Sequence, residues 1–272
     1  MIYPLDHQAA RDVNLAGGKA SALATFLSAN FPVPEGFLVT TASEPDLAMH
    51  LRSLEERIGS HSVFAVRSSG YSEDSEYSSF AGQYETILGV RGFEPISAAI
   101  ARCFASFLNA QSALYRKSRG AGVQGGAVIV QRMIEAEAAG VAFTVDPVTG
   151  ASDRILIESN FGVGDSVVGG HVNPDGFTVT KKSGQVIERR IAAKHVKSLL
   201  RPGGSVLVPM PEAFVSHPSL SDEGIRAVAD LACKAEEHLS VPVDIEWAWK
   251  EGKVWLLQAR AVTTSKGIRD SG

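Results

Sequence analysis

Near the C-terminal end of the chain, two acidic residues and two further polar residues have the spacing of a site for a metal ion and a phosphate. In Asp244-Ile245-Glu246 the acids alternate with an apolar residue, so on a β-strand both carboxylates point to the same face. Gln258 and Arg260 alternate in the same way on the apolar run that follows. If the two runs pair as a hairpin, carboxylate and amide oxygens that suit Mg²⁺ meet a guanidinium that suits phosphate. A solvated hairpin face with cross-strand ion pairs is the alternative.

A double glycine followed by a lysine, Gly17-Gly18-Lys19, comes directly before an apolar pattern of helical spacing. Backbone N–H groups in the first turn of a helix attract anions, and the ammonium group of Lys19 adds a positive charge there. The segment is not a P-loop, because Val13 stands where that motif requires glycine and Ala20 where it requires serine or threonine. The pattern therefore predicts an anion-binding position at Lys19 without the P-loop geometry.

A single arginine, Arg67, lies between the short apolar run 63–66 and a long polar segment that reaches Gly82. This segment is rich in serine, acidic residues and glycine, and loops longer than about 12–15 residues inside a domain are usually functional or disordered. Small residues also leave backbone N–H groups that can approach an anion. Two interpretations stay open: a strand that feeds a binding loop with Arg67 at its root, and an ordinary solvated loop with a rim arginine.

Two other catalytic patterns are incomplete in this chain. The segment 162–167, Gly-Val-Gly-Asp-Ser-Val, departs from the G-x-G-x-x-G fingerprint at its last position. None of the seven histidines has a nucleophile partner that the sequence identifies, and no G-x-S-x-G elbow occurs. Neither a Rossmann dinucleotide site nor a hydrolytic triad is expected.

Hydrophobic spacing predicts helices and strands in both halves of the chain. Apolar residues recur at helical intervals over 18–29, 45–58, 94–118 and 221–239. The predicted strands are 37–39, 63–66, 127–130, 140–144, 155–158, 177–179, 186–187, 243–249 and 254–258, with Glu251-Gly252 as the turn of the last pair. This order predicts an α+β protein with one lobe over 1–122 and a strand-rich lobe over 123–272. A cleft between two lobes is a common site for a small ligand.

The composition is that of an ordinary globular protein, with 272 residues, 44% hydrophobic, and a formal net charge of −4. Lysine and arginine form no run of five, so neither nucleic acid nor an anionic membrane surface is an expected partner. Cys103 and Cys233 lie singly in apolar helical patterns, which suits reduced thiols better than a disulfide or a zinc site. No apolar stretch approaches the roughly 20 residues that span a bilayer. These features predict a cytosolic protein.

Five sequence blocks occur in the order found in the N-terminal nucleotide-binding domain of pyruvate phosphate dikinase, phosphoenolpyruvate synthase and rifampicin phosphotransferase. The blocks are Gly17-Gly18-Lys19-Ala20, AVRSSGYSEDSEYSSFAGQYETIL at 65–88, AVIVQRMIEAEAAGVAFTVDPVTG at 127–150, ILIESNFGVGDSVVGGHVNPDGF at 155–177 and DIEWAWKEGKVWLLQARAVT at 244–263. The chain resembles this family over essentially its whole length. The resemblance implies an α+β ATP-grasp fold, in which two lobes enclose a nucleotide cleft.

The resemblance also implies a role for each candidate residue. The implied catalytic and phosphate-binding residues are Lys19, Arg67 and Arg260. The implied contacts to the rest of the nucleotide are Ser68 and Gly82 in the lid loop after Arg67, Gln131, Met133 and Ile134 at the adenine, and Glu158. The implied ligands of Mg²⁺, or of Mn²⁺, are Glu246, Gln258 and Asp244.

The function that the resemblance implies is the ATP half-reaction of a dikinase. Mg²⁺ and ATP bind, a phosphoryl group passes to a histidine, and AMP is released. Family members carry that histidine in a Thr-Ser-His motif on a swivelling domain, and this sequence contains no Thr-Ser-His. The acceptor is therefore expected on a separate domain or chain. Asp165 stands where the family usually has glutamate. Two alternatives stay open: a stand-alone kinase or ligase that acts directly on a small molecule, and a nucleotide-binding module without turnover.

Overall fold

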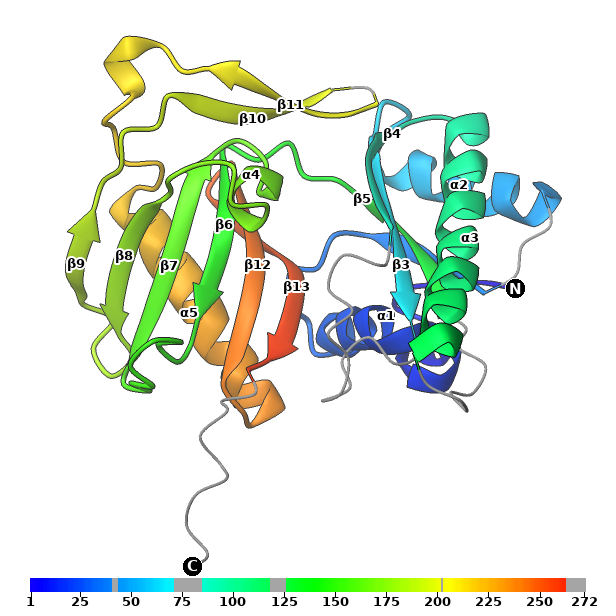
Figure 1. The fold of residues 1–272 in the computed structure, drawn as a ribbon, viewed down its shortest axis with the longest axis horizontal. Coiled ribbons are helices and arrows are strands. Elements are labelled where there is room, and N and C mark those ends of the chain that lie inside the picture. The colour runs from blue at the N-terminus through cyan, green and yellow to red at the C-terminus, as the bar shows by residue number, and fades with distance from the viewer. Residues whose placement is uncertain (41–43, 71–84, 118–125, 202, 263–272) are drawn as a thin grey trace, which may run out of the picture. The chain divides into compact units, whose positions relative to one another are not determined.

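The computed structural model describes residues 1–40, 44–70, 85–117, 126–201 and 203–262, and the chain folds into two compact units (Figure 1). Unit 1 comprises Met1–Met133 and Arg201–Ser205, and unit 2 comprises Ile134–Leu200 and Val206–Gly272. Each unit is built around one main antiparallel sheet that carries helices. This architecture agrees with the α+β class predicted from the sequence.

Unit 1 contains a five-stranded sheet in the order β1-β2-β5-β3-β4. Its strands are β1 (Ile2–Pro4), β2 (Gly36–Val39), β3 (Phe64–Gly70), β4 (Thr86–Val90) and β5 (Gly126–Arg132). The strand β5 is central, since it pairs with β2 on one edge and with β3 on the other, and its apolar run is buried on both faces because the helices α1 (Val13–Ser28) and α3 (Phe93–Lys117) both pack against it. The sequence pattern had placed this run at the start of the second lobe. The structure instead places it in unit 1, and the chain passes from unit 1 to unit 2 after Met133 and not at residue 122.

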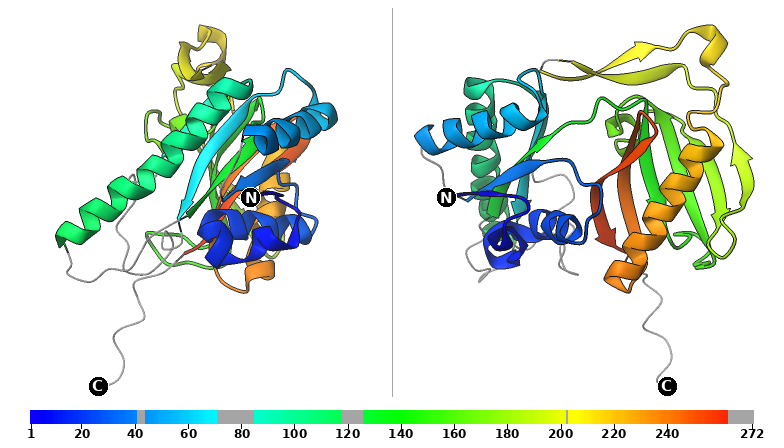
Figure 2. Two further views of the ribbon diagram at one scale, coloured as in Figure 1. Left: turned by 90° about the vertical axis from the view of Figure 1, so that its right-hand side faces the viewer. Right: turned by 180° about the vertical axis from the view of Figure 1, so that it is seen from behind.

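Helices lie on both faces of the unit 1 sheet (Figure 2). The helices α2 (Glu44–Ile58) and α3 (Phe93–Lys117) share an apolar cluster with Phe64 and Val66 of β3. The helix α1 (Val13–Ser28), which follows the short 3-10 helix η1 (Gln8–Arg11), packs against β3 and β5. Because side chains alternate across a strand, the residues of β3 that face α1 are Ala65, Arg67 and Ser69. The three helices predicted in this half of the chain are confirmed.

Unit 2 contains a six-stranded antiparallel sheet in the order β13-β12-β6-β7-β8-β9. Its strands are β6 (Ala138–Phe143), β7 (Arg154–Phe161), β8 (Asp175–Thr180), β9 (Val186–Arg190), β12 (Val243–Lys250) and β13 (Lys253–Ala261). The helix α5 (Asp222–Leu239) begins at Ser221, whose side chain accepts a hydrogen bond from the N–H of Gly224, and it lies along one face of the sheet (Figure 2, right). The opposite face, turned to the viewer in Figure 1, is called the open face below.

A buried ion pair ties the chain segment before β10 (Val196–Arg201) to the first residue of β8. Lys194 Nζ lies 2.6 Å from Asp175 Oδ1, and both side chains are fully buried. Lys194 also donates to the carbonyl oxygen of Ala192 at 2.9 Å. Asp175 accepts from the N–H of Ala192, and from the N–H and hydroxyl of Ser219. These bonds compensate both charges, which is the condition under which an ion pair persists in a protein interior.

Four short elements between residues 165 and 214 were not predicted from the sequence. They are α4 (Asp165–Val168), β10 (Val196–Arg201), β11 (Gly204–Pro209) and the 3-10 helix η2 (Glu212–Phe214). The strands β10 and β11 form a separate two-stranded sheet in which only one residue is buried, so no alternation of buried and solvated residues marks them in the sequence. The strands β1 and β4 of unit 1 were missed as well.

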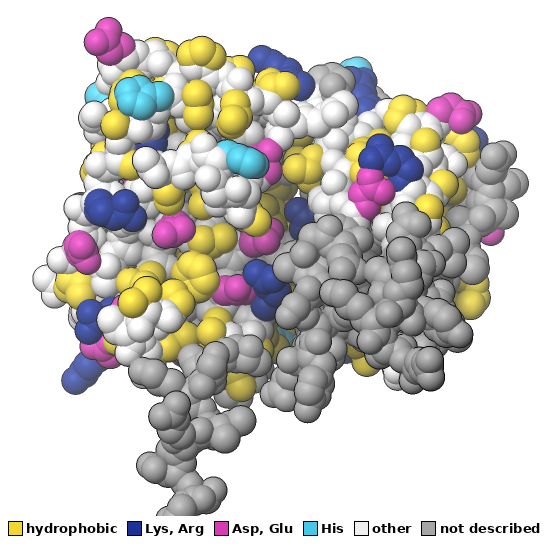
Figure 3. Space-filling view, in the orientation of Figure 1, with side chains coloured by type: hydrophobic (Ala, Val, Ile, Leu, Met, Phe, Trp, Pro, Cys, Tyr) yellow, Lys and Arg dark blue, Asp and Glu magenta, His cyan; other side chains and the backbone are white. Residues whose placement is uncertain are grey.

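Side chains of both charge signs lie on the surface of the protein, and neither cysteine forms a disulfide. On the face shown in Figure 3, acidic and basic side chains are interspersed among hydrophobic ones. Both cysteines are free thiols. Within the described ranges, no helix is both long and apolar enough to cross a membrane.

Candidate functional site

The glycine–lysine segment lies at a break in α1. Gly17 has φ 75° and ψ 169°, so α1 consists of two helical segments joined at this residue. Asp12 caps the first segment by accepting a hydrogen bond from the N–H of Asn14. Lys19 lies in the first turn of the second segment and is half-buried. The predicted position of this lysine, at a helix start after a flexible turn, is therefore confirmed.

Arg67 lies inside β3 and not beyond its end. The strand continues to Gly70, with Arg67 opposite Ile129 of β5 and Thr86 of β4. The sequence had placed the end of this strand at residue 66, because polar residues follow. Arg67 points to the face that α1 covers, so the tertiary structure brings Lys19 and Arg67 to the same side of the unit 1 sheet.

Ser68 points to the opposite face of β3. Its hydroxyl and its N–H both donate to the carbonyl oxygen of Glu85, at 2.9 and 3.0 Å. The Ser68 hydroxyl is thus engaged on the face away from Arg67. Gly82 and most of the predicted lid loop lie outside the described residues.

The buried thiol of Cys103 lies next to β3, with charged groups of both signs around it. Burial raises the pKa of Cys103 to about 12, and the negative charge of Glu85 acts in the same direction, whereas Arg102 and Lys19 oppose it. The Cys103 thiol approaches the carbonyl oxygens of Val66 and Glu85 at 3.7 Å. Cys103 is therefore a protonated core residue and not a nucleophile.

The residues predicted to contact adenine lie where the chain leaves unit 1. Gln131 is 2% exposed, and its side-chain amide donates to the carbonyl oxygen of Pro34 at 3.1 Å. Met133 donates its N–H to the carbonyl oxygen of Val63 at 2.8 Å. Ile134 is the first residue of unit 2, where it forms an apolar cluster with Ala139 and Ala248. The Gln131 amide is thus engaged in fixing the strand, and Ile134 provides apolar surface.

The two C-terminal runs pair as the hairpin that the sequence predicted. Lys250 pairs with Lys253 across a two-residue turn in which Glu251 and Gly252 have φ 50° and 74°. Glu246 lies directly opposite Gln258, and Asp244 directly opposite Arg260. A β-bulge between Glu246 and Trp247 shifts the register by one residue, so that Leu257 is the extra residue of β13 and the four polar side chains meet on the open face.

Within the hairpin, the arginine and one of the acids already form an ion pair. Arg260 Nε lies 3.3 Å from Asp244 Oδ1, and Arg260 Nη2 lies 3.1 Å from Asp244 Oδ2. Asp244 was predicted as a metal ligand, and in this structure its carboxylate faces the guanidinium. The pair Glu246 and Gln258, both half-buried, is the remaining donor set for a cation. One carboxylate and one amide oxygen fit Mg²⁺, which usually takes few protein ligands and completes its shell with water and phosphate oxygens.

Glu158 lies on the same row of the open face as the hairpin residues. Glu246 is in register with Val141 of β6, and Val141 is in register with Glu158 of β7. Two strand spacings of about 4.8 Å separate Glu246 from Glu158. The two carboxylates are 88 positions apart in the chain, so only the sheet brings them onto one surface.

The same row continues to an arginine that sequence reasoning missed. Glu158 is in register with Gly176 of β8, and Gly176 with Arg190 of β9. A Cβ added to Gly176 would lie 3.0 Å from Arg190 Nη2, so the guanidinium lies across the glycine. Arg189 forms an ion pair with Asp222 at the start of α5, which places Arg190 on the open face. The available signal was the charged run Glu188-Arg189-Arg190 directly after the predicted strand 186–187.

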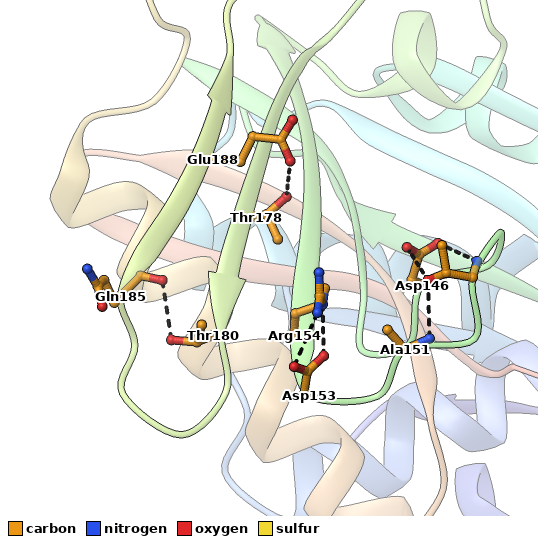
Figure 4. Close-up of polar contacts among 9 residues, drawn as sticks. Asp146, Ala151, Asp153, Arg154, Thr178, Thr180, Gln185 and Glu188 are labelled. Carbon is orange, nitrogen blue, oxygen red and sulfur yellow. Dashed lines mark hydrogen bonds and ion pairs between the residues drawn. The ribbon is translucent and has the colours of Figure 1, made fainter.

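Neighbouring polar side chains on β7–β9 are bonded among themselves (Figure 4). The hydroxyl of Thr178 donates to Glu188 at 3.2 Å, and Arg154 pairs with Asp153 at 2.8 Å. In the turn after β6, hydrogen bonds from Thr149 and its neighbours lower the pKa of Asp146. Asp165, at the start of α4, accepts a hydrogen bond from the hydroxyl of Ser198 at 2.7 Å.

Comparison with known proteins identifies the family. A family model described as "Pyruvate phosphate dikinase, AMP/ATP-binding domain" matches residues 41–271. The "Probable phosphoenolpyruvate synthase" of Methanothermobacter thermautotrophicus is 34% identical, and the alignment covers 93% of this chain and 44% of that protein. The "Prodigiosin synthesizing transferase PigC" of Serratia marcescens is 37% identical, over 91% of this chain and 31% of that protein. The "Rifampicin phosphotransferase" of a Streptomyces species is 38% identical, over 76% of this chain and 24% of that protein. The chain spans less than half the length of these relatives.

Proposed function

This chain belongs to the family of pyruvate phosphate dikinase AMP/ATP-binding domains, and from that membership we propose that it carries out the ATP half-reaction of a dikinase-type phosphotransferase. In this reaction the chain binds ATP with Mg²⁺ and passes a phosphoryl group to a histidine on a separate domain or chain, with release of AMP. The observation that carries the proposal is the hairpin register, which places Glu246 opposite Gln258 and Asp244 opposite Arg260 on the open face.

Glu246 and Gln258 are the residues that would hold the cation. Bound there, Mg²⁺ or Mn²⁺ would neutralise phosphate charge and so favour attack at phosphorus. Asp244 keeps the guanidinium of Arg260 beside this pair through two hydrogen bonds. A guanidinium that a carboxylate already holds in place loses less side-chain freedom when it binds a phosphate than a mobile guanidinium would.

Lys19 and Arg67 are the phosphate-binding residues that we assign to unit 1. Both lie on the α1 side of the sheet, and Lys19 is also at a helix start, where backbone N–H groups favour an anion. Positioning and neutralisation of charge account for most of the catalysis of phosphoryl transfer, so this chain needs no general base of its own. Adenine would lie against the apolar cluster of Ile134, and Glu158 would face the nucleotide from β7.

The ATP-grasp arrangement, with the nucleotide between the two lobes, is part of this proposal. The separate histidine is also part of the proposal. It is supported by the length of the relatives, which are two to four times longer than this chain and therefore contain further domains. Two free cysteines suit a reducing compartment, and we place the protein in the cytosol. A stand-alone kinase acting on a small molecule is distinguished by its products: ADP or AMP would form with that molecule alone, without a histidine-bearing partner.

Calorimetric titration with ATP and Mg²⁺ tests the proposal. Glu246→Ala should lose Mg²⁺-dependent nucleotide binding while it stays folded, because the cation loses its only carboxylate ligand. Glu237→Ala is the matched control, since it removes the same charge from an exposed position of α5 on the other side of the sheet. If Glu246→Ala binds Mg·ATP as tightly as the unmodified protein, the hairpin is a solvated surface and the proposal is wrong.

A further inference from the structure

The side chain of Ser69 makes a long-range hydrogen bond to the helical turn that contains Lys19. This serine is fully buried in β3, two residues after Arg67 and on the same face of the strand. Its hydroxyl oxygen accepts a hydrogen bond from the N–H of Ala20 at 3.0 Å, across 49 positions of the chain. Ala20 directly follows Lys19, so the bond joins the strand that carries Arg67 to the turn that carries Lys19.

The position of Ala20 in α1 explains what this bond does. The second helical segment begins after Gly17, whose φ of 75° is not helical, so Gly18, Lys19 and Ala20 are its first three residues. The first N–H groups of a helix have no acceptor within the helix, and an N-cap side chain usually accepts from the third. Gly17 stands at the N-cap position and has no side chain. The hydroxyl of Ser69 supplies the missing cap from another element.

The close packing at Gly17 supports the same interpretation. A Cβ added to Gly17 would lie 2.2 Å from the carbonyl oxygen of Ser69 and 2.6 Å from its hydroxyl oxygen. Glycine is therefore required there both for the backbone conformation and for space. The turn before Lys19 rests directly on Ser69, and any shift of that serine would move the start of the helix.

We propose that Ser69 is a positioning residue for phosphate binding: it caps the second segment of α1 from β3, and thereby holds Lys19 in a fixed relation to Arg67. The proposal rests on the function proposed above, because its consequence is read out in nucleotide affinity. Two cations bind a polyphosphate best when both are already in place, since ordering them on binding costs free energy. Ser69 itself is not assigned a contact to ATP.

A double-mutant cycle for Mg·ATP affinity tests the proposal. Ser69→Ala should raise the Kd about 5-fold, the size of effect typical of a lost N-cap, and should raise it less than 2-fold when Lys19 is already alanine. Ser106→Ala is the control, because it removes a buried hydroxyl from α3 in the same unit, where it donates to the carbonyl oxygen of Cys103. Its Kd should stay within 2-fold. Equal effects of Ser69→Ala with and without Lys19, or equal effects of the two serine variants, would overturn the proposal.

Amide hydrogen exchange tests the bond from Ala20 to Ser69 in the unmodified protein, so it does not depend on whether Ser69→Ala folds. The amide of Ala20 should exchange at least 100-fold more slowly than in an unstructured chain, although it occupies the third position of a helical segment. Fast exchange at Ala20 would overturn the cap. A protein with a protected Ala20 amide and no affinity for ATP would contradict the proposed function and leave the cap in place.

Discussion

Replacing Lys194 by methionine is expected to destabilise unit 2 strongly, because it breaks an ion pair that is fully buried on both sides. Methionine has a similar length, so the change removes the charge and leaves little empty volume. After the replacement the Asp175 carboxylate would remain buried without its cation. Removing one partner of a buried pair typically costs about 3–5 kcal/mol.

The hydrogen bonds of the pair predict that its two halves are not equivalent. Without Lys194, Asp175 still accepts from the N–H of Ala192 and from the N–H and hydroxyl of Ser219. Without Asp175, the Lys194 ammonium keeps only the carbonyl oxygen of Ala192 and a distant contact to the ring of Phe161. We therefore expect a loss of about 3 kcal/mol for Lys194→Met and of about 5 kcal/mol for Asp175→Ala, the two ends of that range.

Urea unfolding followed by tryptophan fluorescence measures these losses in unit 2 alone. All three tryptophans, Trp247, Trp249 and Trp255, belong to that unit. Lys182→Met is the control, because it removes an exposed lysine and should change the free energy of unfolding by less than about 0.5 kcal/mol. A loss below about 1 kcal/mol for Lys194→Met, as for an exposed ion pair, or a larger loss for Lys194→Met than for Asp175→Ala, would refute the reasoning.

Two further predictions concern unit 1. Arg67→Ala and Lys19→Ala should each weaken ATP binding by about 1.5–3 kcal/mol, the value of a hydrogen bond to a charged group, whereas Arg57→Ala, which removes an exposed arginine paired with Glu35, should not. Unchanged affinity of both variants in calorimetry would contradict the phosphate site. Because burial raises the pKa of Cys103 from 9.0 to about 12, the unfolded chain loses this proton first as pH rises, so the stabilising contribution is complete below pH 9 and is lost between pH 9 and 12. Unfolding free energies of the unmodified protein should fall relative to Cys103→Ala over that range, and parallel profiles would show that the thiol is not protected.

Much of the local structure followed from the sequence. Alternation in 243–249 and 254–258, together with the Glu251-Gly252 turn, predicted the hairpin and its pairing next to the turn. The pairing of Glu246 with Gln258 also needs the β-bulge between Glu246 and Trp247, which shifts the register by one residue and which no local pattern marked. Helical periodicity located α1, α2, α3 and α5 to within a few residues, apart from the start of α1. The break at Gly17 was visible as a double glycine. These features depend on interactions between residues that are close in the chain.

The remaining features required the tertiary structure, because they depend on contacts between residues far apart in the chain. The place of β5 in unit 1 is decided by its pairing with β2 and β3, and no local pattern records which neighbours a buried strand will find. The same pairing keeps β3 extended through Gly70, where the polar residues alone predicted its end. Glu158 joins the Glu246 row only through β6, and Ser69 reaches Ala20 only because α1 packs on β3. Each of these contacts is stable because burial of many apolar groups elsewhere fixes the strands and helices that carry them.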